Sequence, residues 1–436
     1  MSIVANKWVN MISVNQLKQA ISDRVAAYTA TDNPLSARQT MRIALDDACH
    51  HILATDITAH LDIPRQNLSA MDGFAFAHGS DLGDGSMHEI IGESCAGAPF
   101  VGDLKANQGV RIFTGAVVPS ACDTVVMQEN TNFTDIKDTL DKSKPYQITL
   151  TKSATIGANI RRQGEEISRG DVLLHTGKRL NPSDVSLLAS MGYDAVAVYA
   201  PLVVGIIATG DELVAIGNPL DNLAQIYNSN TPTLKALLQK LPITIKDYGI
   251  TKDTLTDTKR TVQQAIDECD IVISSAGVSV GDYDFLTQVV DEIGQINHYK
   301  VAMKPGKPFV FGEFHRQGRT VMYFGLPGNP LSTVVGCINF VRPALWQALG
   351  AIDPPQTLRL TAQSANAIKK NIGRCEYQRG YFKQTPTGFV VSSATTQDSH
   401  RIKQLSQANC LIVLDEACTG VSEGDLVNIE IFDWVM

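Results

Sequence analysis

Three lysines lie within eight positions of one another in a chain with more acidic than basic residues. They are Lys300, Lys304 and Lys307, with Pro305 and Gly306 between the last two. An even spacing returns a side chain to the same side of an extended strand, so Lys300 and Lys304 share a face if the segment is a strand. The turn at Pro305 can bend Lys307 toward them. The cluster predicts a site for phosphate or another oxyanion. The alternative is a solvated surface turn, where lysines are common.

A second pattern that could bind anions follows the lysines. The sequence Gly-Leu-Pro-Gly-Asn-Pro-Leu-Ser-Thr at residues 325–333 leads from a predicted strand at 321–324 into a predicted helix at 331–349. Backbone amides at the helix start, with the hydroxyls of Ser332 and Thr333, form a cradle for phosphate. Glycine and proline at such a turn can also serve backbone geometry alone, and both interpretations stay open. The same holds for the loop at 276–281.

Acidic residues lie in loops, most of them directly after predicted strands. They are Asp72 in the sequence Met-Asp-Gly-Phe-Ala, Asp211 and Glu212 after the first central strand, Asp253 after the second, and Asp282 and Asp284 after the third. Loops that follow neighbouring parallel strands meet at one edge of the sheet. Hard oxygen ligands suit Mg²⁺, which is held by one or two carboxylates plus substrate phosphates. Taken one by one, each acid is better explained as a helix cap or a solvated side chain. The magnesium prediction therefore depends on their convergence.

No local pattern predicts a protein nucleophile or a zinc site. The nine histidines, which include His50, His51 and His400, have no metal-ligand spacing with another ligand type. The eight cysteines contain no Cys-x-x-Cys pair, so we expect free buried thiols rather than a disulfide framework. Chemistry that uses bound anions and a cation is the remaining expectation.

The elements that must position these residues alternate between strands and helices. Short apolar runs at 202–208, 243–248 and 271–275 predict strands. Helical patterns follow at 254–266 and 285–293, and Ser229 or Asn230 can cap a further helix. This alternation predicts a doubly wound, mostly parallel α/β sheet over residues 201–350. Such sheets bind ligands beyond the carboxyl ends of their strands.

The flanking regions differ from this central part in residue composition and in predicted secondary structure. Ser13 and Gln16 form a capping-box pattern that predicts a helix start, and a second helix is predicted over 45–53. Residues 67–160 carry short strand-like runs between glycines and turn residues, which predicts an inserted β-rich domain. Pro354 and Pro355 mark a linker, after which a separate C-terminal β domain over 351–436 is expected.

Composition excludes several classes of protein. The chain has 436 residues, 44% of them hydrophobic and 19% charged, which is typical of a multi-domain globular protein. The net charge of −8 predicts no general attraction to nucleic acid or anionic lipid. The longest uncharged stretch, at 320–341, is interrupted by two prolines, so no membrane span is expected. The first ten residues match neither a secretory nor a transit peptide, and the expected compartment is the cytoplasm.

Seven ordered motifs together resemble one known family. They are Met-Asp-Gly-Phe-Ala at 71–75, Phe-Thr-Gly-Ala at 113–116, Asn-Ile-Arg-Arg-Gln-Gly-Glu at 159–165, Thr-Gly-Asp-Glu-Leu at 209–213, Ser-Ser-Ala-Gly-Val-Ser-Val-Gly at 274–281, Met-Lys-Pro-Gly-Lys-Pro at 303–308, and Gly-Leu-Pro-Gly-Asn-Pro at 325–330. The chain is similar, from its first helix to its last strands, to the MoeA family of molybdopterin molybdenumtransferases, which is related to the C-terminal domain of gephyrin.

The resemblance implies a four-part homodimer with an active site shared between subunits. The parts would be an elongated mixed α/β segment at 1–66 and 161–200, the inserted β-rich domain at 67–160, a central domain like molybdopterin adenylyltransferase at 201–350, and a C-terminal β-barrel-like domain at 351–436. The implied reaction inserts molybdate into adenylylated molybdopterin and releases AMP with the help of Mg²⁺. Transient partners would be the molybdopterin adenylyltransferase and molybdoenzyme maturation proteins. The residues leave molybdate and tungstate both open.

The resemblance also implies a set of site residues. The catalytic residues would be Asp72, Thr114, Glu212, Asp253 and Asp284. Substrate would contact Lys300, Lys304, Lys307, Ser279, Pro327, Asn329, Pro330, Ser332, Arg379 and Ser399. The metal ligands would be Asp72, Glu212, Asp253, Asp284 and Glu166. Glu166 stands where the family commonly has Asp, and Ala276 replaces a glycine. If that position needs a positive φ, alanine there costs about 1 kcal/mol of strain.

Two other functions compete with metal insertion. A non-catalytic scaffold, as gephyrin illustrates, has no use for the acids at 72, 212, 253 and 284. Adenylyltransferase activity of the central domain alone is the nearer rival. The chain has room for one such domain, which favours metal insertion over a bifunctional enzyme.

Overall fold

The computed structural model describes residues 8–29, 39–276, 278, 285–316, 318–394, 396–398 and 401–435. The chain forms two compact units. Unit 1 comprises Met1–Thr55, Thr176–Ser186 and Asp194–Met436, and unit 2 comprises Asp56–His175 and Leu187–Tyr193. The four-part division of the chain stays a prediction. The predicted site residues Ser279, Asp284 and Ser399 lie outside the described residues.

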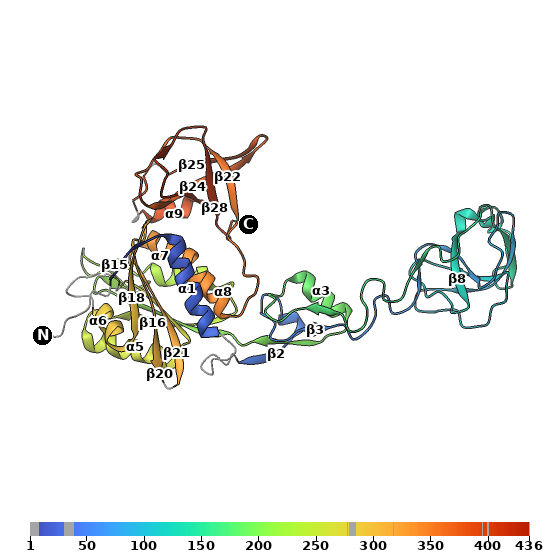
Figure 1. Ribbon diagram of the computed structural model, residues 1–436, viewed down its shortest axis with the longest axis horizontal. Helices are drawn as coiled ribbons and strands as arrows, with labels where there is room; N and C mark the ends of the chain where they lie inside the picture. The colour runs from blue at the N-terminus through green and yellow to red at the C-terminus, as the bar shows by residue number, and fades with distance from the viewer. Residues whose placement is uncertain are drawn as a thin grey trace. The chain divides into compact units, whose positions relative to one another are not determined.

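A seven-stranded sheet forms the centre of unit 1 (Figure 1). Its strands in spatial order are β1 (Trp8–Ile12), β18 (Gln295–Val301), β20 (Pro308–Arg316), β21 (Arg319–Leu326), β17 (Ile271–Ser275), β13 (Leu202–Thr209) and β16 (Ile243–Thr251). The last four strands run parallel to one another, β1 runs parallel to β18, and β20 is antiparallel to both its neighbours. The predicted mostly parallel sheet is confirmed. The carboxyl ends of β21, β17, β13 and β16 therefore meet at one edge.

Helices cover both faces of this sheet. One face carries α1 (Val14–Thr29), α4 (Asn230–Leu238), α7 (Pro330–Gly336) and α8 (Arg342–Ala348), and the other carries α5 (Leu255–Glu268) and α6 (Phe285–Ile293). Within β17, Ile271 and Ile273 pack into the first core and Val272 packs into the second. Successive strand residues point to opposite sides, so an apolar run builds two cores at once. The doubly wound prediction is confirmed.

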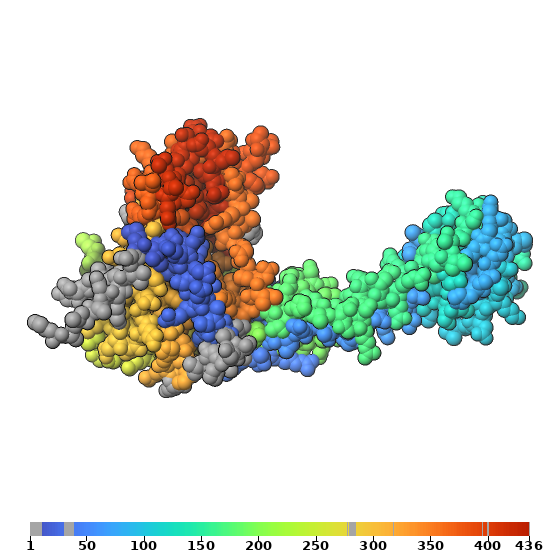
Figure 2. All heavy atoms as spheres, in the orientation of Figure 1, coloured from blue at the N-terminus to red at the C-terminus, as the bar shows by residue number. Residues whose placement is uncertain are grey.

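Helix α1 begins where the capping box predicts. The Gln16 amide donates to Ser13 Oγ (3.1 Å), and the Ser13 amide donates to Gln16 Oε1 (2.8 Å). This exchange satisfies amides that have no partner within the helix. Leu17 and Ile21 are buried in the core below, and α1 packs beside α8 on the outside of unit 1 (Figure 2).

The helix predicted after the 325–330 turn is present but interrupted. Between α7 and α8, residues Cys337–Val341 form a π-helical turn, in which the Arg342 amide donates to the Cys337 carbonyl. Pro343 follows directly. Proline has no amide hydrogen and cannot continue a regular ladder, and a π turn is one way in which a helix accommodates it.

The second helix predicted over 45–53 is wrong. Leu45–Asp47 form a single 3-10 turn, and Ile52 and Leu53 each form a β-bridge with a distant residue. His50 has a φ of +74°, which interrupts a right-handed helix. Ile52 and Leu53 are buried as the pattern implied. The tertiary pairing, rather than a helix, buries them.

The C-terminal part of unit 1 is a closed five-stranded barrel. Its strands in spatial order are β24 (Cys375–Thr385), β25 (Gly388–Ser393), β22 (Arg359–Ser364), β28 (Leu426–Ile431) and β26 (Cys410–Leu414), and β26 pairs back onto β24. The predicted β-barrel-like domain is thus confirmed. Smaller elements of unit 1 are α9 (Ile402–Gln407) and the pairs β23 (Ile368–Lys369) with β27 (Gly420–Val421), β14 (Leu213–Val214) with β15 (Ile226–Tyr227), and β2 (Thr40–Ala44) with β12 (Ala195–Tyr199).

Unit 2 is built around a five-stranded sheet. Its strands in spatial order are β8 (Cys122–Met127, labelled in Figure 1), β5 (Gly73–Ala77), β7 (Gln108–Ile112), β6 (Met87–Ser94) and β9 (Tyr146–Thr149). Phe74 and Phe76 pack on one face and Ala75 on the other. The predicted β-rich character of residues 67–160 is confirmed. The remaining elements are α2 (Phe133–Ile136), a 3-10 turn at Gln128–Asn130, β3 (Ile57–Thr58) with β11 (Val172–Leu174), β4 (Leu68–Ser69) with β10 (Ile160–Arg161), and α3 (Pro182–Ser190), which spans both units.

Two predictions about the whole chain can be compared with the structure. Among the described residues, no helix is both long and apolar enough to cross a membrane. All eight cysteines are free, as expected, but only Cys122, Cys269, Cys337 and Cys410 are buried, and the other four are partly exposed. Burial raises the pKa of the Cys122, Cys337 and Cys410 thiols to about 12 each, so these three are inert apolar groups at neutral pH.

Candidate functional site

Asn230, the first residue of α4, joins two loops at the carboxyl edge of the central sheet. It is 8% exposed. Its amide nitrogen donates to Ser275 Oγ at the end of β17 and to the carbonyl of Gly328 in the turn after β21, each at 2.7 Å. Its Oδ1 is buried and has no hydrogen-bond partner among the described residues. One side chain thereby links the start of α4 to the end of β17 and to the turn after β21, and β17 and β21 are neighbouring strands of the sheet.

The turn at 325–330 is closed by Thr333. The Thr333 hydroxyl donates to the Pro327 carbonyl (2.6 Å), and the Thr333 amide donates to the Asn329 carbonyl (2.9 Å). Thr333 and Ser332 are both buried. The Thr333 hydroxyl therefore serves the geometry of the turn, as the alternative interpretation expected. The predicted contact of Ser332 with substrate stays a prediction. Asn329 and Pro330 are half-buried and stay candidates for substrate contact.

Ala276 has a positive φ, which is the condition under which alanine is expected to be strained at this position. Its φ is +80°, in the left-handed region that L-residues avoid. The Ala276 amide donates to the Leu326 carbonyl (3.0 Å), which places this strained residue beside the 325–330 turn. The condition for strain at Ala276 is met.

The acids after the first two central strands lie in loops that contact each other. The Asp253 amide, after β16, donates to Asp211 Oδ1, after β13 (3.1 Å). Glu212 is exposed, and its carboxylate folds over Gly210 so closely that a Cβ there would lie 2.6 Å from Glu212 Oε2. Asp211 thus orders the loops. Glu212 presents its carboxylate at the sheet edge, as predicted.

The three lysines are exposed, but they do not share one strand. Lys300 lies in β18, whereas Lys304 lies in the short strand β19 (Met303–Lys304), which pairs with β24 of the barrel. The argument that both side chains share one face of a single strand is therefore wrong. The turn between them is closed by the Val301 amide, which donates to the Lys307 carbonyl (2.8 Å). All three residues are exposed and belong to one short segment.

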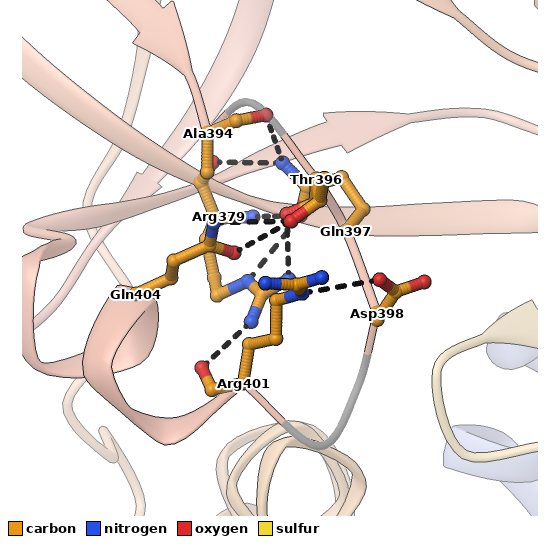
Figure 3. A network of polar contacts seen from close by, with 7 residues as sticks. All are labelled: Arg379, Ala394, Thr396, Gln397, Asp398, Arg401 and Gln404. Atoms are coloured by element: carbon orange, nitrogen blue, oxygen red, sulfur yellow. Dashed lines mark hydrogen bonds and ion pairs between the residues drawn. The ribbon is translucent and has the colours of Figure 1, made fainter.

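Arg379 is enclosed in the barrel, where it holds a loop in place (Figure 3). Its side chain is 0% exposed. The guanidinium donates to the carbonyls of Thr396 and Arg401, each at 3.0 Å, and the Arg379 amide donates to Gln397 Oε1 (3.0 Å). A buried guanidinium committed to backbone oxygens cannot also bind a phosphate. The predicted substrate contact of Arg379 is corrected to positioning of the loop.

In unit 2, the structure brings Asp72 and Thr114 together. The Thr114 amide (2.7 Å) and hydroxyl (2.8 Å) both donate to Asp72 Oδ1. These bonds, the amide first, hold the pKa of the Asp72 carboxyl below its ordinary value, and the charge of Arg111 adds to the effect. A Cβ on the next residue, Gly73, would overlap the carbonyl oxygen of Val126, which explains the glycine. Asp72 is exposed and ionised at neutral pH.

The predicted metal ligands are distributed over both units. Asp72 and the exposed Glu166 belong to unit 2, whereas Glu212 and Asp253 belong to unit 1. Within the described part of the chain, no three His, Cys, Asp or Glu side chains are grouped to hold a metal ion. A cation that takes one or two carboxylates and completes its shell with substrate phosphates needs no such group. The oxygen donors of Glu212 and Asp253 fit that description.

Comparison with known proteins identifies the family. Three family models match consecutive parts of the chain: the MoeA N-terminal region (domains I and II) at residues 12–192, the probable molybdopterin binding domain at 205–347, and the MoeA C-terminal region (domain IV) at 361–432. The chain belongs to the MoeA family. A relative from Haemophilus influenzae, named molybdopterin molybdenumtransferase, is 37% identical over 91% of this chain and 95% of its own length. A Staphylococcus aureus protein of the same name is 34% identical over 91% and 92%.

The fold comparison agrees with this membership. The crystal structure of a molybdopterin biosynthesis MoeA protein from Pyrococcus horikoshii matches with a TM-score of 0.76 at 23% identity, covering 97% of this chain and 100% of that one. MoeA membership confirms the family resemblance and the prediction of a transferase. It assigns the chain to molybdenum cofactor biosynthesis.

Two residues of the site region were not singled out as functional from the sequence. Local patterns mark Asn230 only as a helix cap, and they do not mark Glu376, which contacts Lys304. Asn230 follows a predicted βα loop, and an amide at such a position is a usable signal. Glu376 lies in the barrel, far along the chain from Lys304, and no local pattern connects the two.

Proposed function

We propose that this MoeA-family chain inserts molybdate into adenylylated molybdopterin and releases AMP with the help of Mg²⁺. The observation that carries the proposal is the arrangement at the edge of the central sheet. There, loops with Asp211, Glu212 and Asp253 follow neighbouring parallel strands. The match of residues 205–347 to a probable molybdopterin binding domain supports a pterin ligand at this sheet.

The charges suit a polyanionic substrate. Adenylylated molybdopterin carries a diphosphate, and molybdate is a second anion. The exposed ammonium groups of Lys300, Lys304 and Lys307 would neutralise the phosphates through charge-assisted contacts. Asn329 and Pro330 would line the substrate at the turn that Thr333 closes. In this reaction the lysines bind and orient substrate, and no side chain forms a bond to it.

Glu212 and Asp253 would hold Mg²⁺ together with the substrate phosphates. When bound, the cation would polarise the phosphoanhydride and stabilise the charge that develops as it breaks. An oxygen of water or molybdate would form a bond to the adenylyl phosphorus, the anhydride P–O bond would break, and the molybdopterin phosphate would leave. With water the product is AMP directly, and with molybdate a water molecule then cleaves the adenylyl–molybdate to AMP. The two dithiolene thiols would bind molybdenum, and their two protons would leave with one displaced molybdate oxygen as water. Asp72, kept ionised by Thr114, would orient molybdate or accept a proton.

The active site in this proposal is shared in a homodimer. Asp72 and Thr114 come from unit 2 of one subunit, and Glu212 and Lys304 come from unit 1 of its partner. The support is that Asp72 and Thr114 contact each other within unit 2, whereas Glu212 and Lys304 both belong to unit 1. We further propose that the protein acts in the cytoplasm and transiently contacts the molybdopterin adenylyltransferase and molybdoenzyme maturation proteins.

The test is AMP release by the purified chain. Adenylylated molybdopterin is incubated with or without molybdate and with or without Mg²⁺, and AMP is separated and quantified while molybdenum in the pterin product is measured. We expect both products only when molybdate and Mg²⁺ are present together. Release of AMP that is independent of Mg²⁺, with no molybdenum in the product, would contradict the proposal.

A further inference from the structure

Lys304 is attached to the barrel rather than to the central sheet. Met303 and Lys304 pair in parallel with Cys375 and Glu376, the first residues of β24. The Cys375 amide also donates to the Ala302 carbonyl (2.8 Å). The backbone under the Lys304 side chain is therefore an edge strand of the C-terminal barrel. Pairing with the barrel therefore fixes the backbone position of Lys304.

A buried carboxylate lies beside the ammonium group of the same lysine. Glu376 is 4% exposed, and its Oε1 lies 3.7 Å from Lys304 Nζ. Its other oxygen, Oε2, accepts a hydrogen bond from Gln378 Nε2 (2.9 Å). Lys304 itself is 48% exposed on its side chain, so the ammonium stands at the surface with an enclosed carboxylate behind it. Burying a carboxylate is costly unless it is paired, and here the lysine supplies the charge.

Hydrogen bonds continue from Glu376 through the barrel. Ser393 Oγ donates to Gln378 Oε1 (3.3 Å), and Gln397 Nε2 donates to Ser393 Oγ (3.0 Å). Gln397 in turn accepts the Arg379 amide, and the Arg379 guanidinium donates to the carbonyls of Thr396 and Arg401 (Figure 3). Gln378, like Glu376, is 4% exposed. Buried networks whose members are satisfied are rigid, so this one can hold Glu376 in a single orientation.

We propose that Glu376 is a positioning residue that fixes the Lys304 ammonium for the substrate phosphates, and that the buried Gln378–Ser393–Gln397–Arg379 network holds Glu376 in place. The inference rests on the proposed function, in which Lys304 binds phosphate. A lysine held in one orientation loses less conformational freedom on binding than a free one. Glu376 and the network behind it thus contribute to the active site without touching the substrate.

The charge of Glu376 gives the proposal a test that depends on sign. Electrostatics alone predicts that Glu376→Gln tightens the binding of an anionic substrate, because a negative charge near the phosphates is removed. Positioning predicts the opposite result, because Lys304 loses its anchor. We expect binding to weaken about threefold to tenfold, the range that corresponds to ordering one long side chain. Glutamine keeps the size of Glu376 and an oxygen for Gln378 Nε2, so the fold should be retained.

The experiment measures the Kd of adenylylated molybdopterin with Mg²⁺ present and molybdate omitted, so that no turnover occurs. The full chain is compared with Lys304→Ala, Glu376→Gln and the double variant. Glu430→Gln is the matched control, because Glu430 is 3% exposed in the same barrel and pairs with Arg359 instead (2.6 Å). Thermal unfolding of each variant reports on the fold. If Glu376→Gln does not fold, Glu376→Asp keeps the charge and withdraws it from Lys304.

We expect Lys304→Ala to weaken binding about tenfold to a hundredfold. The double variant should match Lys304→Ala alone, and Glu430→Gln should match the wild type. If Lys304→Ala binds weakly while Glu376→Gln binds as tightly as the wild type or more tightly, the positioning role is overturned and the proposed function stands. If Lys304→Ala binds like the wild type, the proposed role of Lys304 fails, and the positioning role fails with it.

Discussion

The two parts of the candidate site are held by different kinds of contact. At the sheet edge of unit 1, Asn230 is buried and bridges Ser275 and Gly328, which lie 45 and 98 residues away in the chain. In unit 2, Asp72 is exposed and takes both of its close hydrogen bonds from Thr114. The first part is held by buried hydrogen bonds from a neutral amide. In the second part, one residue donates both hydrogen bonds to an exposed carboxylate.

The difference has consequences for stability and for activity. Breaking a buried hydrogen bond leaves polar groups without water, which costs more than the bond itself contributes. An exposed charged contact contributes little to stability, because water and salt replace it. Changes at Asn230 should therefore affect folding and activity together. Changes at Asp72 and Thr114 should affect activity alone.

The largest effects are expected at the two exposed acids. We expect Asp72→Ala and Glu212→Ala each to lower molybdenum insertion and AMP release by about a hundredfold or more, since each removes charge at the reacting groups. Thermal unfolding should be unchanged, because both side chains are exposed. Asp84→Ala and Asp221→Ala, at exposed acids outside the site, are the matched controls. Unchanged AMP release in either site variant would remove that acid from the mechanism.

Asn230→Ala should combine a loss of stability with a loss of activity. The change leaves Ser275 Oγ and the Gly328 carbonyl without the amide that they share, and we expect the free energy of unfolding to fall by about 2 to 3 kcal/mol. Denaturant unfolding measures the loss, and Kd for the substrate should rise as the 325–330 turn loosens. Asn230→Asp, which keeps the size but not the two donated bonds, should behave similarly. Wild-type stability in both variants would show that the two hydrogen bonds of Asn230 do not stabilise the fold.

Thr114→Val should change the pH dependence rather than the stability. The hydroxyl bond to Asp72 is lost and the amide bond is kept, so the depressed pKa of Asp72 should rise toward its ordinary value. As the solution is acidified, Asp72 is then protonated at a higher pH than in the wild type. The acid limb of the pH–rate profile for AMP release should therefore move to higher pH. A rate profile between about pH 4 and 7 measures this shift. Thr114→Ser should restore the wild-type limb. An identical limb in Thr114→Val would contradict the role of the hydroxyl.

Ala276→Gly should give the smallest effect, in the stabilising direction. Glycine relieves the strain of a φ of +80° but gains freedom in the unfolded chain. We expect a net gain of about 0.5 to 1 kcal/mol in the free energy of unfolding. Chemical denaturation measures this gain. A loss of stability would show that the contacts of the alanine side chain outweigh the strain at position 276.

Elements with strong local patterns were predicted well from the sequence. The bounds of α6 at Phe285–Ile293 and of β17 at Ile271–Ser275 are those predicted, because their apolar spacing and their flanking breakers are local. The Ser13 capping box is likewise a contact across three residues. The acid at 212 was placed correctly at a strand end, because the βαβ pattern fixes where strand ends lie.

The features that could not be predicted depend on contacts between distant parts of the chain. Lys304 belongs to the barrel because β19 pairs with β24, and two residues carry too little pattern to show it. Arg379 looks like an anion ligand by residue type, and only its burial shows otherwise. The helix expected over 45–53 failed because Leu53 bridges to Val198, which a local window does not contain. In each case tertiary pairing overrides local preference.

Subunit complementation tests the shared active site most directly. Chains with Asp72→Ala and chains with Lys304→Ala, carrying different tags, are each assayed alone and then mixed under conditions that exchange subunits, with exchange verified by co-purification. A heterodimer holds one site with both wild-type residues and one with neither, so a random mixture should recover about a quarter of wild-type AMP release. Each homodimer alone should be nearly inactive. No recovery despite verified exchange would contradict a site built from unit 2 of one subunit and unit 1 of its partner.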